Sequence, residues 1–153
     1  MICQDAASRC ITSDNAKGRI VFIDQKIERS RDGSGYGRGI LSRVAGAVEA
    51  ARRGASAVAI RSLGTDSDRI AHTGAMRYDP SVAQVPAIAV SVLDADLIAR
   101  LHAGGQALRM RLRMERTSRV QATSHNVIAE VPGTDLAQEI VLVGAHLDSW
   151  DIT

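Results

Sequence analysis

Short apolar runs alternate with amphipathic stretches over the first two thirds of the chain, a pattern typical of an α/β fold. Three apolar runs, at 18–24, 56–61 and 86–91, predict buried strands. Two stretches with apolar residues at three- and four-residue spacing predict helices over 38–53 and 94–103. Because the first helix lies between two strands, we expect a strand–helix–strand crossover unit.

The first predicted helix has one apolar face and follows a glycine-rich stretch. Its contact face should consist of Ile40, Val44 and Val48, with Leu41 and Ala45 beside them. Glycines at 33, 35, 37 and 39 predict a turn or flexible lid over 30–39. Their spacing is not that of a dinucleotide fingerprint, and no Gly-Lys-Ser/Thr follows, so a phosphate loop is excluded.

The last third of the chain predicts further strands. Gln106–Arg116 alternates apolar residues with arginines, which predicts a half-buried antiparallel strand with a solvated outer face. Asn126–Val131 predicts another strand, and Ile140–Val143 has the composition of a buried one. The segments 124–131 and 139–144, on either side of a Pro-Gly turn, should form a hairpin.

Candidate chemistry follows the last of these runs. After Gly144 comes His146, and Asp148 lies two residues further on. Imidazole is a good zinc ligand, and a nearby carboxylate can accept its other ring N–H and fix the tautomer. From spacing alone, a hydrogen-bonded pair at a strand end without metal remains the favoured interpretation.

The whole string Val-Leu-Val-Gly-Ala-His-Leu-Asp-Ser-Trp-Asp (141–151) closely resembles the opening of the catalytic domain in co-catalytic zinc exopeptidases of the aminopeptidase and carboxypeptidase Q type. The resemblance implies that His146 is a zinc ligand and that Asp148 orients it. Trp150 and Asp151 belong to the motif without an assigned role. The complete family site holds two zinc ions, and its remaining ligands and Glu general base would follow Thr153, so we expect the site to be incomplete in this chain.

A second segment resembles a protease-associated domain, a small α/β module found in some exopeptidases. Gly-Arg-Ile-Val-Phe-Ile-Asp, an Ala/Gly-rich helix and Val-Pro-Ala-Ile-Ala-Val-Ser occur in the expected order. The expected organisation is a connector over 1–17, a protease-associated domain with a mixed sheet and flanking helices over 18–117, and the first hairpin of a truncated catalytic domain over 118–153.

A long polar loop over 61–78 contains His72. Carboxypeptidase Q relatives carry a similar Arg-Ser-x-Gly-Thr…His-Thr-Gly segment. Because a lone histidine in a loop is most often a solvated surface residue, we expect a solvated side chain at His72 and assign it no role.

Composition and charge limit the kinds of partner and the location that the sequence predicts. A net charge of +2 with dispersed basic residues gives no reason to expect nucleic acid. The first residues lack the pattern of a signal peptide, and no apolar stretch is long enough for a membrane span, so the chain leaves its localisation open. Relatives of this type are mostly secreted or periplasmic, which suggests a missing N-terminus. Cys3 and Cys10 lack Cys-x-x-Cys spacing and are expected to be free thiols, or a disulfide if the protein is exported.

The resemblance implies a zinc metallopeptidase that removes residues from the ends of peptides or dipeptides, with this chain inactive by itself. One alternative is a stand-alone protease-associated module that binds peptides or partner proteins. Another is a partial product whose unpaired hairpin edge self-associates. The oligomeric state, the substrate side chain and the choice between amino- and carboxyl-terminal action are left open.

Overall fold

The computed structural model describes residues 2–3, 11–65, 67–115 and 121–147. The chain divides into two compact units, Met1–Met114 and Glu115–Thr153. The helices and strands of the described residues all lie in the first unit: β1 (Ile2–Cys3), α1 (Ser13–Ala16), β2 (Ile20–Ile23), α2 (Ser34–Arg52), β3 (Ala57–Arg61), β4 (Ala87–Val90) and α3 (Val92–Ala103). None of these helices has the length and apolar character needed to cross a membrane.

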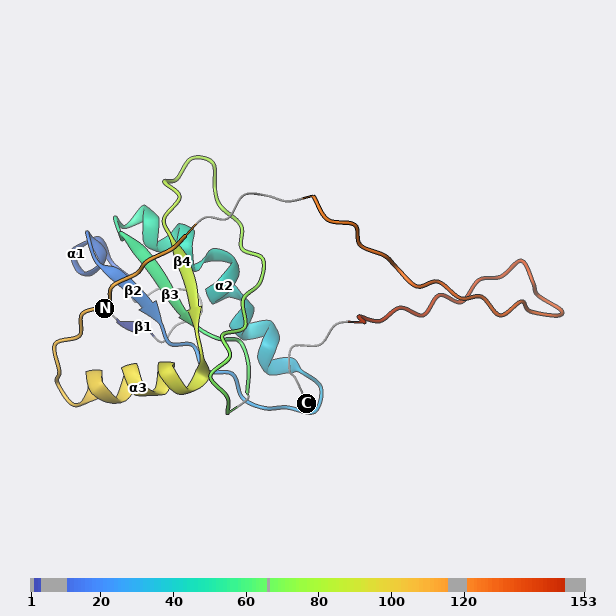
Figure 1. The fold of residues 1–153 in the computed structure, drawn as a ribbon, viewed down its shortest axis with the longest axis horizontal. Coiled ribbons are helices and arrows are strands. Elements are labelled where there is room, and N and C mark those ends of the chain that lie inside the picture. The colour runs from blue at the N-terminus through green and yellow to red at the C-terminus, as the bar shows by residue number, and fades with distance from the viewer. Residues whose placement is uncertain (1, 4–10, 66, 116–120, 148–153) are drawn as a thin grey trace. The chain divides into compact units, whose positions relative to one another are not determined.

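The first unit is built on a four-stranded sheet in the order β1-β2-β3-β4 (Figure 1). Ile20 lies opposite Ala57, and Val58 lies opposite Ala87. The α/β class is therefore confirmed, but the expected mixed sheet is wrong for the described strands, because each neighbouring pair runs parallel. Since β1 pairs with β2, the segment before residue 18 contributes to the fold and is more than a connector.

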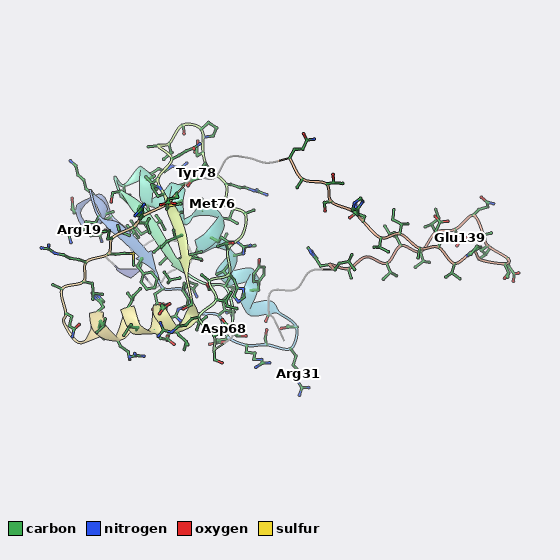
Figure 2. The ribbon with its side chains drawn as sticks, in the orientation of Figure 1. Arg19, Arg31, Asp68, Met76, Tyr78 and Glu139 are labelled. Carbon is green, nitrogen blue, oxygen red and sulfur yellow. The ribbon has the colours of Figure 1, made fainter. Side chains whose placement is uncertain are left out.

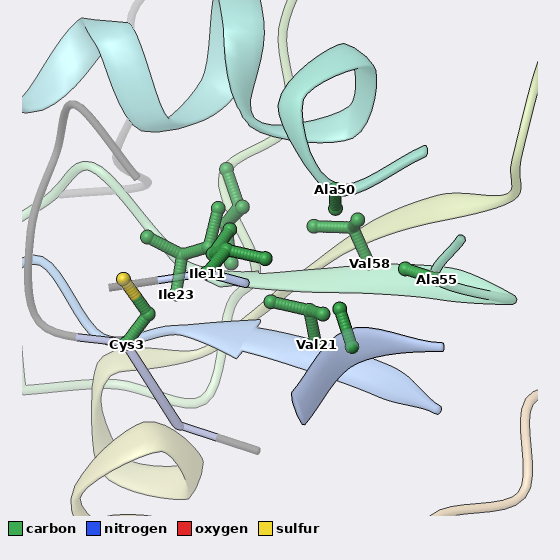
Figure 3. Packing of buried hydrophobic residues seen from close by; sticks show 9 residues of the cluster. Cys3, Ile11, Val21, Ile23, Ala50, Ala55 and Val58 are labelled. Carbon is green, nitrogen blue, oxygen red and sulfur yellow. The ribbon is translucent and has the colours of Figure 1, made fainter. Parts of the chain in front are cut away.

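The two faces of the sheet pack against different helices because strand side chains alternate between faces. Phe22 and Ala59 lie in one cluster with Ala95 of α3. Val21 and Val58 lie in the other cluster with residues such as Ala50 of α2 (Figure 3). A parallel sheet covered on both faces needs apolar side chains on both, which explains the near-continuous apolar runs of β2 and β3.

Cys3 is almost fully buried in the cluster on the α2 side of the sheet. It is disulfide-bonded, so the expectation of free thiols is wrong at this position. Cys10 lies outside the described residues. Ile11 and Ala16 are buried in the same cluster as Cys3. Apolar residues that precede the first predicted strand thus complete the core on this side of the sheet.

Helix α2 packs on the sheet through small residues, and the predicted apolar face is wrong. The residues at successive turns on its buried side are Gly35, Gly39, Ser42, Gly46 and Ala50. Of the predicted face only Val48 is buried, whereas Leu41 is 49% exposed. Small side chains allow the helix backbone to approach the sheet closely, and a Cβ on Gly46 would lie only 2.6 Å from the Cδ1 atom of Ile23.

The glycine-rich stretch begins this helix instead of forming a lid. Gly33, with a φ of 69°, precedes the first helical residue, and the Asp32 carboxylate accepts the Ser34 N–H at 3.1 Å. A Cβ on Gly35 would overlap the carbonyl oxygen of Glu28. The expected loop over 30–39 is therefore wrong from Ser34 onward, because some of its glycines serve close packing and not flexibility.

The alternating segment 106–116 does not form the predicted antiparallel strand. Its described residues, 106–115, have no regular secondary structure, and Leu108, Met110 and Met114 remain 37–57% exposed. Alternating apolar and polar residues allow a segment to form a strand with one apolar face. To pair with other strands, that segment also needs an accessible edge of a sheet. Arg116 lies outside the described residues.

The second unit also lacks the predicted strands within its described residues. No strand is formed over 126–131 or 139–144. Val141 and Leu142 are each 90% exposed, so the run from Ile140 to Val143 is not buried. A turn at 137–138 is held by the Glu139 N–H, which donates to the Leu136 carbonyl at 2.9 Å. The sequence of Ile140–Val143 suits a buried strand, but the described part of this unit supplies no sheet to bury it.

The close approach of Gly35 gives a direct test of the α2 packing. Gly35→Ala should lower the free energy of unfolding by about 1–3 kcal/mol, because the new methyl group overlaps the Glu28 carbonyl. Gly37→Ala is the matched control: this helical position is exposed, a Cβ there meets nothing within 4 Å, and the variant should gain up to about 1 kcal/mol in helix propensity. Urea unfolding of both variants measures the difference, and equal stabilities would contradict this packing.

Candidate functional site

The segment that contains His146 does not form a complete metal site among the described residues. His146 is exposed and follows the extended, exposed run Ile140–Val143. No group of three or more His, Cys, Asp or Glu side chains within the described parts of the chain could hold a metal ion. Asp148, Trp150 and Asp151 lie outside the described residues. The described residues alone therefore do not fit the zinc centre that the sequence motif implies.

A second cluster of chemically active side chains lies at the carboxyl edge of the parallel sheet, the usual ligand-binding edge of α/β folds. Arg61 ends β3, and its side chain is only 3% exposed. Its Nε donates to Asp24 at 2.6 Å, Nη1 donates to the Val92 carbonyl at 3.2 Å, and Nη2 donates to Asp96 at 2.9 Å. One guanidinium group thereby connects the ends of β2 and β3 with the first turns of α3.

The two carboxylates around Arg61 differ in their surroundings. The Asp24 side chain is fully buried, and its Oδ2 atom has no hydrogen-bond partner among the described residues. Asp96 is partly exposed and also lies 3.3 Å from Lys26 Nζ. The hydrogen bond from Arg61 holds the pKa of the Asp96 carboxyl below its ordinary value, and the charges of Arg61 and Lys26 act in the same direction. Asp96 is therefore a carboxylate at neutral pH.

A pocket of about 240 Å³ opens beside this cluster. Its lining includes three cationic side chains, Lys26, Arg29 and Arg61, and a single acidic one, Asp96. Ile27, Gly64, Thr65 and Val92, the first residue of α3, complete the lining. Such a pocket favours negatively charged ligands, since its cations outnumber its carboxylates.

The loop over 61–78 is more firmly attached to the fold than its polarity predicts. His72 is 8% exposed, and its backbone N–H donates to the buried Ser62 hydroxyl at 3.0 Å, so the expectation of a solvated histidine is wrong. The Arg77 N–H donates to the Val44 carbonyl of α2, and the Tyr78 hydroxyl donates to the Val85 carbonyl at 2.7 Å.

The same loop borders a small second pocket. Figure 2 shows Met76 and Tyr78 on it. Together with α2, β3 and β4, the loop encloses an apolar pocket of about 80 Å³. The guanidinium of Arg43 borders this pocket, stacks on the Tyr36 ring at 5.7 Å and approaches Gly74 so closely that a Cβ there would overlap it. These contacts fix the loop to the helix, which explains an ordered polar segment without secondary structure.

Sequence reasoning singled out His146, which stays a prediction, and missed the Arg61 cluster. Its members come from three separate segments, and only the strand order brings Asp24 and Arg61 together. A usable signal was present, because each is a charged residue that directly follows or ends an apolar strand run. Asp96 carried no such signal, since an acidic residue in the first turns of a helix is common.

Comparison with known proteins shows which enzymes the chain is similar to. It is 36% identical to carboxypeptidase Q of Bos taurus over 138 residues, which is 90% of this chain and 28% of that protein. Identity to carboxypeptidase Q of Mus musculus is 34% over 140 residues, 92% of this chain and 28% of that protein. This chain is carboxypeptidase Q-like. The resemblance first suggested by the Val-Leu-Val-Gly-Ala-His-Leu-Asp string is thus confirmed over most of the sequence.

A solved structure agrees with the carboxypeptidase Q-like assignment. The crystal structure of a peptidase M28 precursor from Shewanella amazonensis SB2B superimposes with a TM-score of 0.66 and 42% identity, covering 69% of this chain and 24% of that one. No protein-family model matches the chain. The chain spans little more than a quarter of the length of the curated relatives that it matches.

Arg61 should be the most sensitive charged position of this carboxypeptidase Q-like fold. Arg61→Met should cost about 3–5 kcal/mol in unfolding free energy, because it leaves Asp24 and Asp96 without their common partner. Arg69→Met is the control: its pair with Asp94 is formed by exposed side chains and should be worth at most about 1 kcal/mol. If chemical unfolding shows similar losses of unfolding free energy in the two variants, burial of the Arg61 charge has no special role in stability.

Proposed function

We propose that this chain contributes to a metallopeptidase that hydrolyses terminal peptide bonds, with peptides or dipeptides as substrates. The proposal rests on the 36% identity to carboxypeptidase Q, which extends over 90% of the chain. The peptidase M28 neighbour, at 42% identity, supports the same class of reaction. Because this chain matches only part of each of these much longer proteins, the activity is proposed for the whole enzyme.

Within that enzyme, we assign residues 18–117 to a protease-associated domain and 118–153 to the first hairpin of the catalytic domain. The small α/β sheet with a helix on each face supports the first assignment. The chain divides into its two units between Met114 and Glu115, which supports a domain boundary near residue 117. The disulfide at Cys3 favours an exported enzyme, because disulfides persist mainly in oxidising compartments.

His146 is the proposed zinc ligand of this chain, with Asp148 accepting its second ring N–H. The position of His146 directly after an apolar run and Gly144 supports the assignment. Zinc in such enzymes polarises the scissile carbonyl and lowers the pKa of a bound water. Since the described residues contain no group of three or more His, Cys, Asp or Glu that could hold a metal, we expect further ligands from outside them.

A second candidate function is a binding module without catalysis. It is favoured by the first unit, which has its own core and a cationic pocket, and by the lack of a metal grouping within the described residues. The module would bind peptides or partner proteins through the same α/β fold. Zinc content separates the two candidates, since only the peptidase requires His146 to bind metal.

The 153-residue chain by itself should show no peptidase activity. One proposed ligand on an exposed segment cannot assemble a zinc centre, which needs several donors held in fixed geometry. Release of free amino acids from a dipeptide panel, with and without added zinc, measures this. Turnover that depends on zinc and is abolished by a chelator would show that the chain carries a complete site.

In the protein expressed from its full reading frame, His146→Ala should reduce bound zinc by at least one equivalent, measured by atomic emission on the purified protein. His125→Ala is the matched control, because His125 is also an exposed histidine of the second unit and lies outside the motif. Unchanged zinc content in His146→Ala, or equal losses in both variants, would overturn the ligand assignment whatever the activity.

A further inference from the structure

We propose that the pocket beside Arg61 binds a small oxyanion, a carboxylate or phosphate group, independently of any zinc centre. The pocket is lined by Lys26, Arg29, Arg61 and Asp96 together with Gly64 and Thr65. It lies in the first unit, whereas His146 lies in the second. The two sites can therefore be tested separately.

Arg61 supplies the central donors. A guanidinium group carries five N–H donors, two of them on each terminal nitrogen. Nε and one N–H from each terminal nitrogen are used by Asp24, Val92 and Asp96. One N–H on each terminal nitrogen has no partner among the described residues, and an end-on carboxylate or phosphate uses one from each. Arg61 lines the pocket, which makes these two N–H groups the candidate donors to a ligand inside it.

The position of Arg61 is fixed before any ligand arrives. Its side chain is 3% exposed and is held by two carboxylates and a carbonyl oxygen from two other segments. A buried and oriented guanidinium loses little conformational freedom when it binds an anion. Burial also weakens screening by solvent, so the remaining N–H groups should bind an oxyanion more strongly than an exposed arginine does.

The surrounding charges favour an anion over a cation. Arg61 is compensated by Asp24 and Asp96, and Lys26 shares Asp96. Arg29 is exposed and has no ion-pair partner among the described residues, so the pocket retains uncompensated positive charge. Thr65 also lines the pocket, and the positive end of the α3 dipole at Val92 adds further attraction for an oxyanion.

The test is a titration of the isotopically labelled 153-residue chain with sodium phosphate, followed by amide NMR at constant ionic strength. Saturable shifts should be concentrated at the backbone amides of Ile27, Gly64 and Thr65. Arg29→Gln should weaken binding roughly tenfold, the effect of losing one charge-assisted hydrogen bond. Arg31→Gln is the matched control, because Arg31 is exposed on the same loop, does not line the pocket and points away from the sheet (Figure 2).

A second arm distinguishes the sources of the oxyanion. The same chain is titrated with a dipeptide and with its carboxyl-terminal amide. Binding of the acid but not the amide identifies a peptide carboxylate, and binding of phosphate alone identifies a phosphate group; both support the proposal. Equal binding of acid and amide, unsaturable shifts in every titration, or equal weakening by Arg29→Gln and Arg31→Gln would overturn it.

Discussion

The buried guanidinium of Arg61 is the interaction on which the carboxyl edge of the sheet depends. A charge at this depth is tolerated only with close partners, and Arg61 finds them in Asp24 after β2 and in Asp96 on α3. Its bond to the Val92 carbonyl places the start of α3 against the same edge. The Arg61 side chain thus contacts the neighbouring strand end and α3, and it also lines the cationic pocket.

Strands β2, β3 and β4 could be predicted from the sequence because both faces of a covered parallel sheet demand apolar residues, as in Val21 on one face and Phe22 on the other. The contact face of α2 could not. A hydrophobic pattern assigns the buried face of a helix to large apolar side chains. It therefore misses the buried glycines of α2, Gly35, Gly39 and Gly46. They are buried because the helix must come close to Ile23 and the Glu28 carbonyl, and that requirement is set by tertiary geometry.

The candidate sites were predictable to different degrees for a related reason. His146 stands within one contiguous string, so local sequence was enough to single it out. The cluster of Asp24, Arg61 and Asp96 is assembled from three segments by the order of parallel strands, which no local pattern encodes. His72 shows the same limit, since its burial depends on a hydrogen bond to Ser62 and not on its polar neighbours.

The two units place different demands on the proposed enzyme. The first has a buried apolar core of its own, whereas Val141 and Leu142 of the second are 90% exposed. A metal ligand must be held rigidly by packing and by hydrogen bonds around it, and an exposed run outside any sheet cannot hold His146 in that way. If His146 binds zinc, a sheet that came to bury this run would also orient the ligand. Completion of the sheet and assembly of the metal centre would then be one structural event.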